Sequence, residues 1–135
     1  MFPDLLVTPT GVRILSTVQV AKRPDSTRRG YHFVAVDVRA TNTGKLPNCT
    51  NVEAFLTTDG GYDYTARRPD DPSEPKLGDL LGGEVATGSY VFEVEDALIP
   101  RWLTVLQRTG TWRGCEVRGH VDLIAPRVRL PLTVH

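Results

Sequence analysis

Residues 31–44, YHFVAVDVRATNTG, decide the fold class of this chain. Side chains alternate between the two faces of a β-strand, so the segment separates into two rows. One row is apolar and consists of Val34, Val36, Val38 and Ala40. The other row is wetter and consists of Asp37, Arg39 and Thr41. We therefore expect a strand with one buried face, and its Asn-Thr-Gly ending is typical of a turn.

The rest of the chain repeats this pattern at short, regular spacing. Further strands are expected at about 12–20, 52–58, 84–95, 102–107, 115–124 and 128–134, with a short one beginning at Tyr62 and Tyr64. Segments 22–30 (a hairpin-like loop), 59–61 (Asp-Gly-Gly) and 67–76 (three prolines) separate them. No segment shows the 3.6-residue apolar period of a helix. The chain is predicted to be a single domain, 1–135, folded as an all-β, immunoglobulin-like antiparallel β-sandwich of about 7–8 strands.

The alternation also assigns faces within the later strands. Tyr90, Phe92 and Val94 form an expected inward row. Leu103 and Val105 share one face of their strand, and Trp102, Thr104 and Leu106 share the other. We expect Trp102 to pack against the sheet, and Pro131 indicates that the last strand lies at a sheet edge, where a missing N–H costs no ladder bond.

Charge and composition argue against nucleic-acid binding and against insertion into a membrane. The 135 residues carry 16 Lys and Arg against 16 Asp and Glu, for a formal net charge of +0. Nucleic-acid-binding domains usually carry a basic excess, so no nucleic acid is expected. No apolar run reaches the length of a membrane helix, so no membrane insertion by this chain is expected. The opening MFPD has neither the charged start nor the apolar stretch of a secretory signal.

The two cysteines, Cys49 and Cys115, fit either one disulfide or two free thiols. A bridge would close a loop of roughly 65 residues and stabilise the fold by about 4 kcal/mol in the chain-entropy model. Cys115 is in phase with Val117 and Val121, which indicates an inward-facing side chain. Buried free thiols are also common, so both states remain open.

Four segments together resemble a known family. They are FVAVDVRATNTG at 33–44, FLTTDGGYDY at 55–64, LGDLLGGEVATG at 77–88 and YVFEVEDAL at 90–98. This pattern resembles the telokin-like, immunoglobulin-like bacterial domains of unknown function, which include a mycobacterial secreted immunoprotective antigen. The matching positions are Val34, Val36, Val38, Asn42, Gly44, Asp59, Gly60, Tyr62, Gly83, Gly88, Phe92 and Val94.

Every matching position is a core or turn residue. The resemblance therefore implies a fold and transfers no catalytic residue. Members of the family commonly lie outside the cytoplasm, behind a signal peptide or lipid anchor. The resemblance thus implies an extracytoplasmic location, secreted or envelope-anchored, with a cytoplasmic one as the alternative.

The residues needed for catalysis do not form a recognisable set. A nucleophilic serine or cysteine needs a histidine in reach, and no serine occupies a Gly-x-Ser-x-Gly elbow. The histidines are His32, His120 and His135, and we interpret His32 and His120 as exposed residues opposite the apolar rows of their strands. Cys-x-x-Cys and His-x-His spacings are missing, as is any cofactor motif. We expect neither enzymatic activity nor a cofactor.

Calcium is the one metal that the acidic residues suggest. Asp59 and Asp63 flank the Gly-Gly turn, and Asp70 and Asp71 lie in the next loop. Hard cations bind several carboxylate and carbonyl oxygens on flexible loops. Turn-forming aspartates explain the same residues more simply, so a calcium-stabilised structural domain is an alternative only.

Two loops that carry arginine, one of them beside a tryptophan, favour recognition of a protein partner. Trp112 and Arg113 lie in one loop, and Arg67 and Arg68 begin the other. Tryptophan beside arginine is typical of an interface anchor. We expect a non-enzymatic binding or protein-interaction module of the bacterial cell envelope or secreted space. The alternative to this module is a proteinase-inhibitor-like sandwich that presents the loop at 67–76.

Overall fold

Nine antiparallel strands form the secondary structure of the residues described in the computed structural model. Those residues are 5–15, 17–20, 23–26, 29–45, 50–61, 63–66, 80–109 and 127–132. Within these ranges the chain contains no helix able to cross a membrane.

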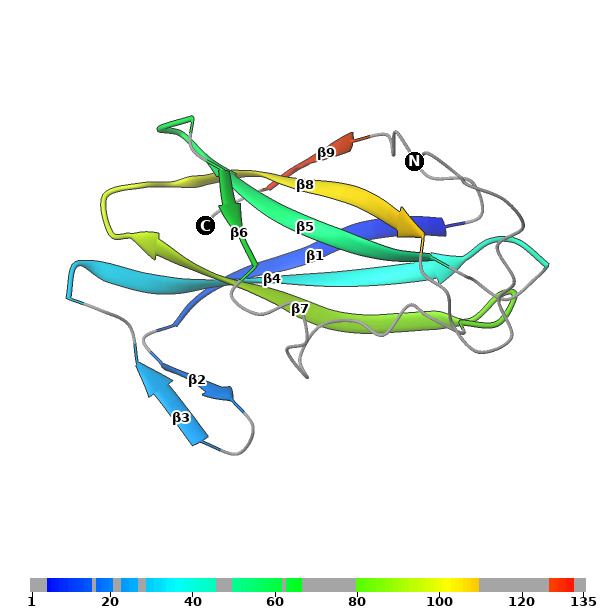
Figure 1. Cartoon of the computed structure of the whole chain (residues 1–135), viewed down its shortest axis with the longest axis horizontal. Coiled ribbons are helices and arrows are strands. Elements are labelled where there is room, and N and C mark those ends of the chain that lie inside the picture. Colours follow the sequence, from blue (N-terminus) through cyan, green and yellow to red (C-terminus); the bar gives the residue numbers. More distant parts are fainter. Residues whose placement is uncertain are drawn as a thin grey trace.

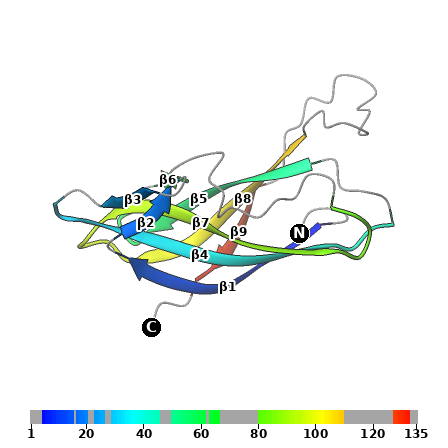
Figure 2. The same cartoon turned by 90° about the horizontal axis from the view of Figure 1, so that it is seen from below.

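Two sheets build the sandwich. The first has the order β1-β4-β7, with β1 at Leu5–Leu15, β4 at Tyr31–Asn42 and β7 at Val85–Glu95. The second has the order β6-β5-β8-β9, with β5 at Thr50–Thr58, β6 at Asp63–Thr65, β8 at Pro100–Thr109 and β9 at Arg127–Pro131. Figure 1 shows both sets of strands along the long axis of the molecule, and Figure 2 shows β1, β4 and β7 side by side.

This strand order is that of the immunoglobulin fold. In that fold strands A, B and E share one sheet and strands C, F and G share the other. Here β1, β4 and β7 take the first set of places, and β5, β8 and β9 take the second. The predicted antiparallel sandwich of about 7–8 strands is confirmed, since seven strands form the two sheets, and Pro131 does lie on an edge strand.

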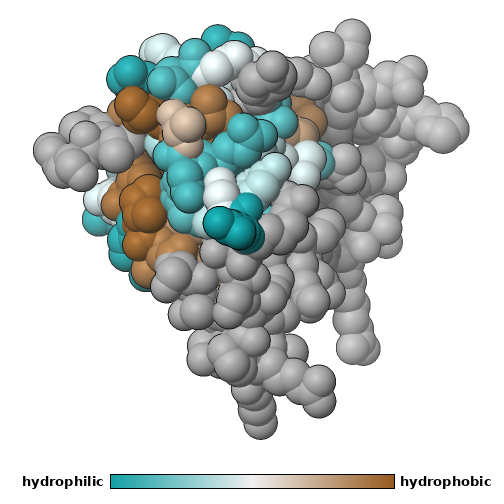
Figure 3. Space-filling view, turned by 90° about the vertical axis from the view of Figure 1, so that its left-hand side faces the viewer, coloured by the Kyte–Doolittle hydropathy of each residue, from teal (hydrophilic) through white to brown (hydrophobic). Residues whose placement is uncertain are grey.

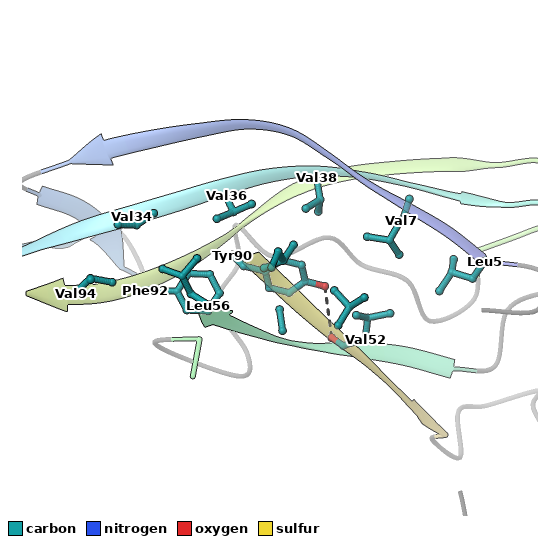
Figure 4. Packing of buried hydrophobic residues seen from close by; sticks show 14 of the residues in the cluster. Leu5, Val7, Val34, Val36, Val38, Val52, Leu56, Tyr90, Phe92 and Val94 are labelled. Atoms are coloured by element: carbon teal, nitrogen blue, oxygen red, sulfur yellow. Dashed lines mark hydrogen bonds between the residues drawn. The ribbon is translucent and has the colours of Figure 1, made fainter. Parts of the chain in front are cut away.

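The core fills the space between the sheets, as Figure 4 shows. The predicted inward rows of β4 and β7 are confirmed: Val34, Val36, Val38, Ala40, Tyr90, Phe92 and Val94 are all buried. They pack against Val52, Leu56 and Leu103 of the facing sheet. The Tyr90 hydroxyl donates to the carbonyl of Val52 at 3.4 Å, so the one polar group of this aromatic row has a partner.

A β-bulge in β1 explains why the first strand begins earlier than predicted. The register with β4 shifts between Pro9 and Gly11, which inserts one extra residue. Inward positions are odd before the shift, as at Val7, and even after it, as at Val12. A search for uninterrupted alternation therefore detects only the second half of this strand.

The segment after β1 also differs from the prediction. A single strand at 12–20 and a loop at 22–30 were expected. Instead β1 ends at Leu15, and β2 (Thr17–Val20) pairs with β3 (Arg23–Ser26) in a separate two-stranded sheet. In Figure 1 this hairpin lies at the end of the sandwich where β4 begins. Turning the chain back within a few residues pairs Val20 with Arg23 and removes both from the main sheet.

The outward face of β4 carries a second apolar cluster that the sequence did not predict. Phe33 and Ala35 lie in the row interpreted as wetter, yet both are completely buried. They pack with Val91 of β7, and partly buried Leu15 of β1 adds to the cluster. Both faces of the three-stranded sheet are therefore apolar at this end.

Asn42 joins the end of β4 to the turn before β7. Its side-chain amide donates to the Leu80 carbonyl at 2.8 Å, and its side-chain oxygen accepts from the Gly44 amide at 2.9 Å. Its backbone bonds to Glu84 and Gly83 at 3.0 and 2.8 Å. Within the Asn-Thr-Gly ending, Asn42 is thus a buried link between two segments of the chain and is only 1% exposed.

Candidate interaction surface

The outward face of β5, β8 and β9 is the strongest candidate for a functional surface. We call it the Trp102 face, and it consists of Glu53, Phe55, Thr57, Trp102, Thr104, Leu106, Arg129 and Pro131. These residues alternate with the inward side chains of the same strands, such as Leu56 and Leu103. Strand period therefore assigns the face, and the pairing of β5, β8 and β9 brings it together.

Trp102 is the most prominent residue of this face. It lies between Thr57 of β5 and Pro131 of β9 and leaves 38% of its surface exposed. Thr57 is buried beside it, and the Thr57 hydroxyl donates to the Asp63 carboxylate at 2.6 Å. The prediction that Trp102 packs against the sheet is not confirmed, because Trp102 belongs to the exposed residues and joins neither buried cluster. A large aromatic surface still remains accessible at a residue type enriched among binding hot spots.

A second bulge brings a cation next to this tryptophan. The pairing of β5 with β8 shifts so that Thr57 faces Trp102 and Thr58 faces Pro100, which leaves Arg101 as the extra residue. Arg101 and Arg129 are both exposed. Within the described ranges neither guanidinium makes an ion pair or hydrogen bond, and the sequence analysis singled out neither residue.

Other exposed apolar side chains are more scattered. Leu6 and Val85 lie in one row on the outward face of the first sheet, and Ile14 lies near the end of β1. Figure 3 looks onto the end of the sandwich where β4 begins and shows apolar residues in separate groups among hydrophilic ones. Isolated exposed aliphatic residues are ordinary on protein surfaces, so these groups define no site.

Asp59 and Asp63, two of the residues considered for calcium, make contacts within the fold. The Asp59 carboxylate accepts from the Ile99 amide at 2.9 Å, and the Asp59 amide donates to the Ile99 carbonyl at 2.9 Å. Asp63 accepts from the Thr57 hydroxyl. No group of three His, Cys, Asp or Glu side chains that could hold a metal occurs in the described parts of the chain. Asp70 and Asp71 lie outside them.

Several predicted site residues also lie outside the described residues. They are Arg67, Arg68, Trp112, Arg113, Cys49 and Cys115. The inhibitory loop, the Trp112 anchor and the disulfide therefore remain predictions.

A charged network occupies the outward face of the first sheet. Arg13 donates to both carboxylate oxygens of Asp37, with its Nη2 2.8 Å from Oδ1. Ser89, which pairs with Asp37 across the strands, donates its hydroxyl to the same carboxylate and accepts from Arg13 at 3.3 Å. Burial raises the pKa of Asp37, but the hydrogen bonds from Arg13 and Ser89 and the charge of Arg13 together outweigh it and lower that pKa.

The pKa of Asp37 predicts a small, one-sided pH dependence of stability. Because the unfolded chain binds this proton more readily, the contribution is fully present above the unfolded pKa of about 3.9. It is lost as the pH falls through the lower folded pKa. The side chains of Arg13 and Asp37 are 52% and 30% exposed, so we expect less than about 1 kcal/mol.

Urea unfolding of the wild type and of Asp37→Asn between pH 2 and pH 7 measures this contribution. The wild type should be more stable at pH 7, and the difference should shrink in acid. Arg13→Gln should remove the same pH dependence. An Asp37→Asn difference that stays constant with pH would contradict the assigned pKa shift.

The interpretation of His32 as an exposed residue is wrong. His32 is in phase with Val34 and Val36 on the core side of β4, and its side chain is only 16% exposed. It lies at the start of the strand, where Nδ1 reaches the Asp96 carboxylate at 2.9 Å. His32 and Ser89 occupy opposite faces of the sheet, so they do not form a nucleophile–base pair.

Comparison with known proteins shows the fold alone. No family model matches the chain, and no curated protein sequence matches it. A crystal structure of a conserved hypothetical protein from Bacillus anthracis is similar, with TM-score 0.57 and 17% identity over 79% of this chain and 84% of that one. An uncharacterized β-sandwich protein from Clostridium difficile 630 shows TM-score 0.48 and 10% identity over 80% of this chain and 81% of that one.

Proposed function

We propose that this β-sandwich is a non-enzymatic protein-interaction module and that it binds its partner through the Trp102 face. The observation that carries the proposal is the exposed indole of Trp102, held on the outward side of a four-stranded sheet. Tryptophan supplies a large contact area at low cost in conformational entropy, which favours a protein surface as its partner.

The wider setting of the proposal is the bacterial cell envelope or the secreted space. The resemblance of residues 33–44, 55–64, 77–88 and 90–98 to the telokin-like bacterial domains supports both this location and membership of that family. Three of the resembling positions, Asn42, Gly44 and Gly83, are joined by hydrogen bonds that hold the end of β4 against the turn before β7. Membership of the family and extracytoplasmic location are parts of the same proposal.

Replacing Trp102 with threonine should weaken partner binding at least about tenfold while the protein stays folded. Threonine suits a strand, and the loss of the partly buried indole should cost about 1–2 kcal/mol of stability. A selection of phage-displayed random 12-residue peptides on the wild-type protein supplies the ligands. Peptides recovered by the wild type should bind Trp102→Thr at least about tenfold more weakly, which corresponds to about 1.4 kcal/mol.

Val85→Thr is the matched control, because Val85 is an exposed strand residue on the outward face of the other sheet. This variant should bind the same peptides as well as the wild type. Circular dichroism melts verify that both variants are folded. Recovery of the same peptides by Trp102→Thr, or of no peptide by the wild type, would end the proposal.

A further inference from the structure

We propose that the partner presents an acidic segment to the Trp102 face, with carboxylates bound by Arg101 and Arg129 beside the indole. This inference rests on the proposed function and adds the chemistry of the partner. Arginine recognises carboxylates through a planar fork of N–H donors and stacks well on aromatic rings, so the neighbourhood of Trp102 suits such a segment.

The edge strand β9 and its neighbour β8 are basic within a chain of balanced charge. β8 reads PRWLTVLQRT and β9 reads RVRLP, which together hold four arginines and no acidic residue. The whole chain has a formal net charge of +0. Positive charge is therefore concentrated on these two strands, and the pairing of β8 with β9 sets Arg129 opposite Thr104, two pairs along from Trp102 and Pro131 and on the same face.

The charges of Arg101 and Arg129 are not used within the described fold. Arg13 on the other sheet is the contrasting case, because its guanidinium is already bound to a carboxylate of the fold: it donates to both oxygens of Asp37. Arg101 and Arg129 are exposed and have no such carboxylate in the described ranges. A carboxylate of the partner could thus bind these two arginines without first breaking an ion pair within the described fold.

The bulge at Arg101 adds a structural reason. A regular ladder would place a single residue between Pro100 and Leu103, both of which are buried, but the strand holds two, Arg101 and Trp102. Bulges commonly redirect a side chain next to a functional site. Here the bulge places an exposed cation and an exposed aromatic residue consecutively at the start of β8.

A protein segment fits this surface better than a nucleic acid. Asp63 is exposed on β6, and Glu53 lies on the β5 side of the Trp102 face, so the positive charge covers only the β8–β9 side. A nucleic acid follows a longer basic track and is held through many phosphates. A short acidic peptide needs only the two arginines and one apolar contact.

The phage selection tests the charge of the partner directly. The wild type should recover peptides with at least two Asp or Glu near an aromatic or aliphatic residue. A synthetic, fluorescein-labelled copy of the best peptide is then titrated by fluorescence anisotropy. Its Kd should rise at least about tenfold for the double variant Arg101→Gln/Arg129→Gln, and severalfold when NaCl increases from 0.05 to 0.3 M.

Arg39→Gln is the matched control, because Arg39 is an exposed arginine on the outward face of the other sheet. It should bind like the wild type. Neutral or basic peptides that depend on Trp102 but not on the two arginines would overturn this inference and leave the interaction module standing. Peptides that bind Trp102→Thr as tightly as they bind the wild type would overturn both this inference and the proposed interaction module. A labelled dT12 oligonucleotide that bound more tightly than the acidic peptide would assign the arginines to nucleic acid instead.

Discussion

Phe33→Ala should lower the free energy of unfolding by about 3–5 kcal/mol, the range for truncating a fully buried phenylalanine. Phe33 is 0% exposed although it lies on the face of β4 that points away from the main core. Its partners Ala35, Val91 and Leu15 form a cluster separate from the one between the sheets. If the face were open to solvent, as strand alternation alone suggests, the same change would cost well under 1 kcal/mol.

Urea denaturation gives the free energy of unfolding of this variant, provided that the slope with denaturant stays unchanged. Val85→Ala serves as the control, because Val85 lies on the same face of the sheet but is 51% exposed. It should change stability by less than about 0.5 kcal/mol. Equal, small effects of both changes would show that the second cluster contributes nothing.

Asn42→Ala should cost about 2–4 kcal/mol, although it removes only a few atoms. The change deprives the Leu80 carbonyl and the Gly44 amide of their partners. A polar group left buried without a partner costs about 1–3 kcal/mol. Gly82 packs against this link so closely that an added Cβ would lie 2.8 Å from the carbonyl oxygens of Gly44 and Lys45, so the turn has little room to adjust.

Thr43→Ala is the matched control for this link, since Thr43 is the exposed neighbour of Asn42. It should leave the midpoint of urea unfolding almost unchanged. Hydrogen exchange of the Gly44 and Gly83 amides adds a local measurement, because both donate to Asn42. In Asn42→Ala these amides should exchange faster than those of central β4. An Asn42→Ala protein as stable as Thr43→Ala would contradict the role assigned to the link.

Short-range pattern explains why so much of the fold was predictable. Alternation alone assigns the inward rows of β4, β7 and β8, because each side chain's face follows from its position in the strand. The same rule fails where a strand contains a bulge: Val7 and Val12 are both inward but have opposite parity. It also fails at Phe33, where the supposed outward face is buried.

The candidate surface was less predictable than the fold. Alternation placed Trp102 with Thr104 and Leu106, yet it could not show that the indole keeps 38% of its surface exposed. Arg129 is far from Trp102 in the sequence and joins the Trp102 face only because β8 pairs with β9. No local motif marks such a pair of residues.

Local sequence pattern is enough to predict the class of fold, the inward rows of β4 and β7 and the turn at Asn42-Thr43-Gly44. These features depend on neighbours a few residues apart, and strand period is enough to read them. Only the tertiary fold shows that the Asn42 side chain binds the segment before β7, that Phe33 is buried and that Trp102 and Arg129 share one face. Those outcomes depend on register, bulges and packing between distant segments, which no local pattern records.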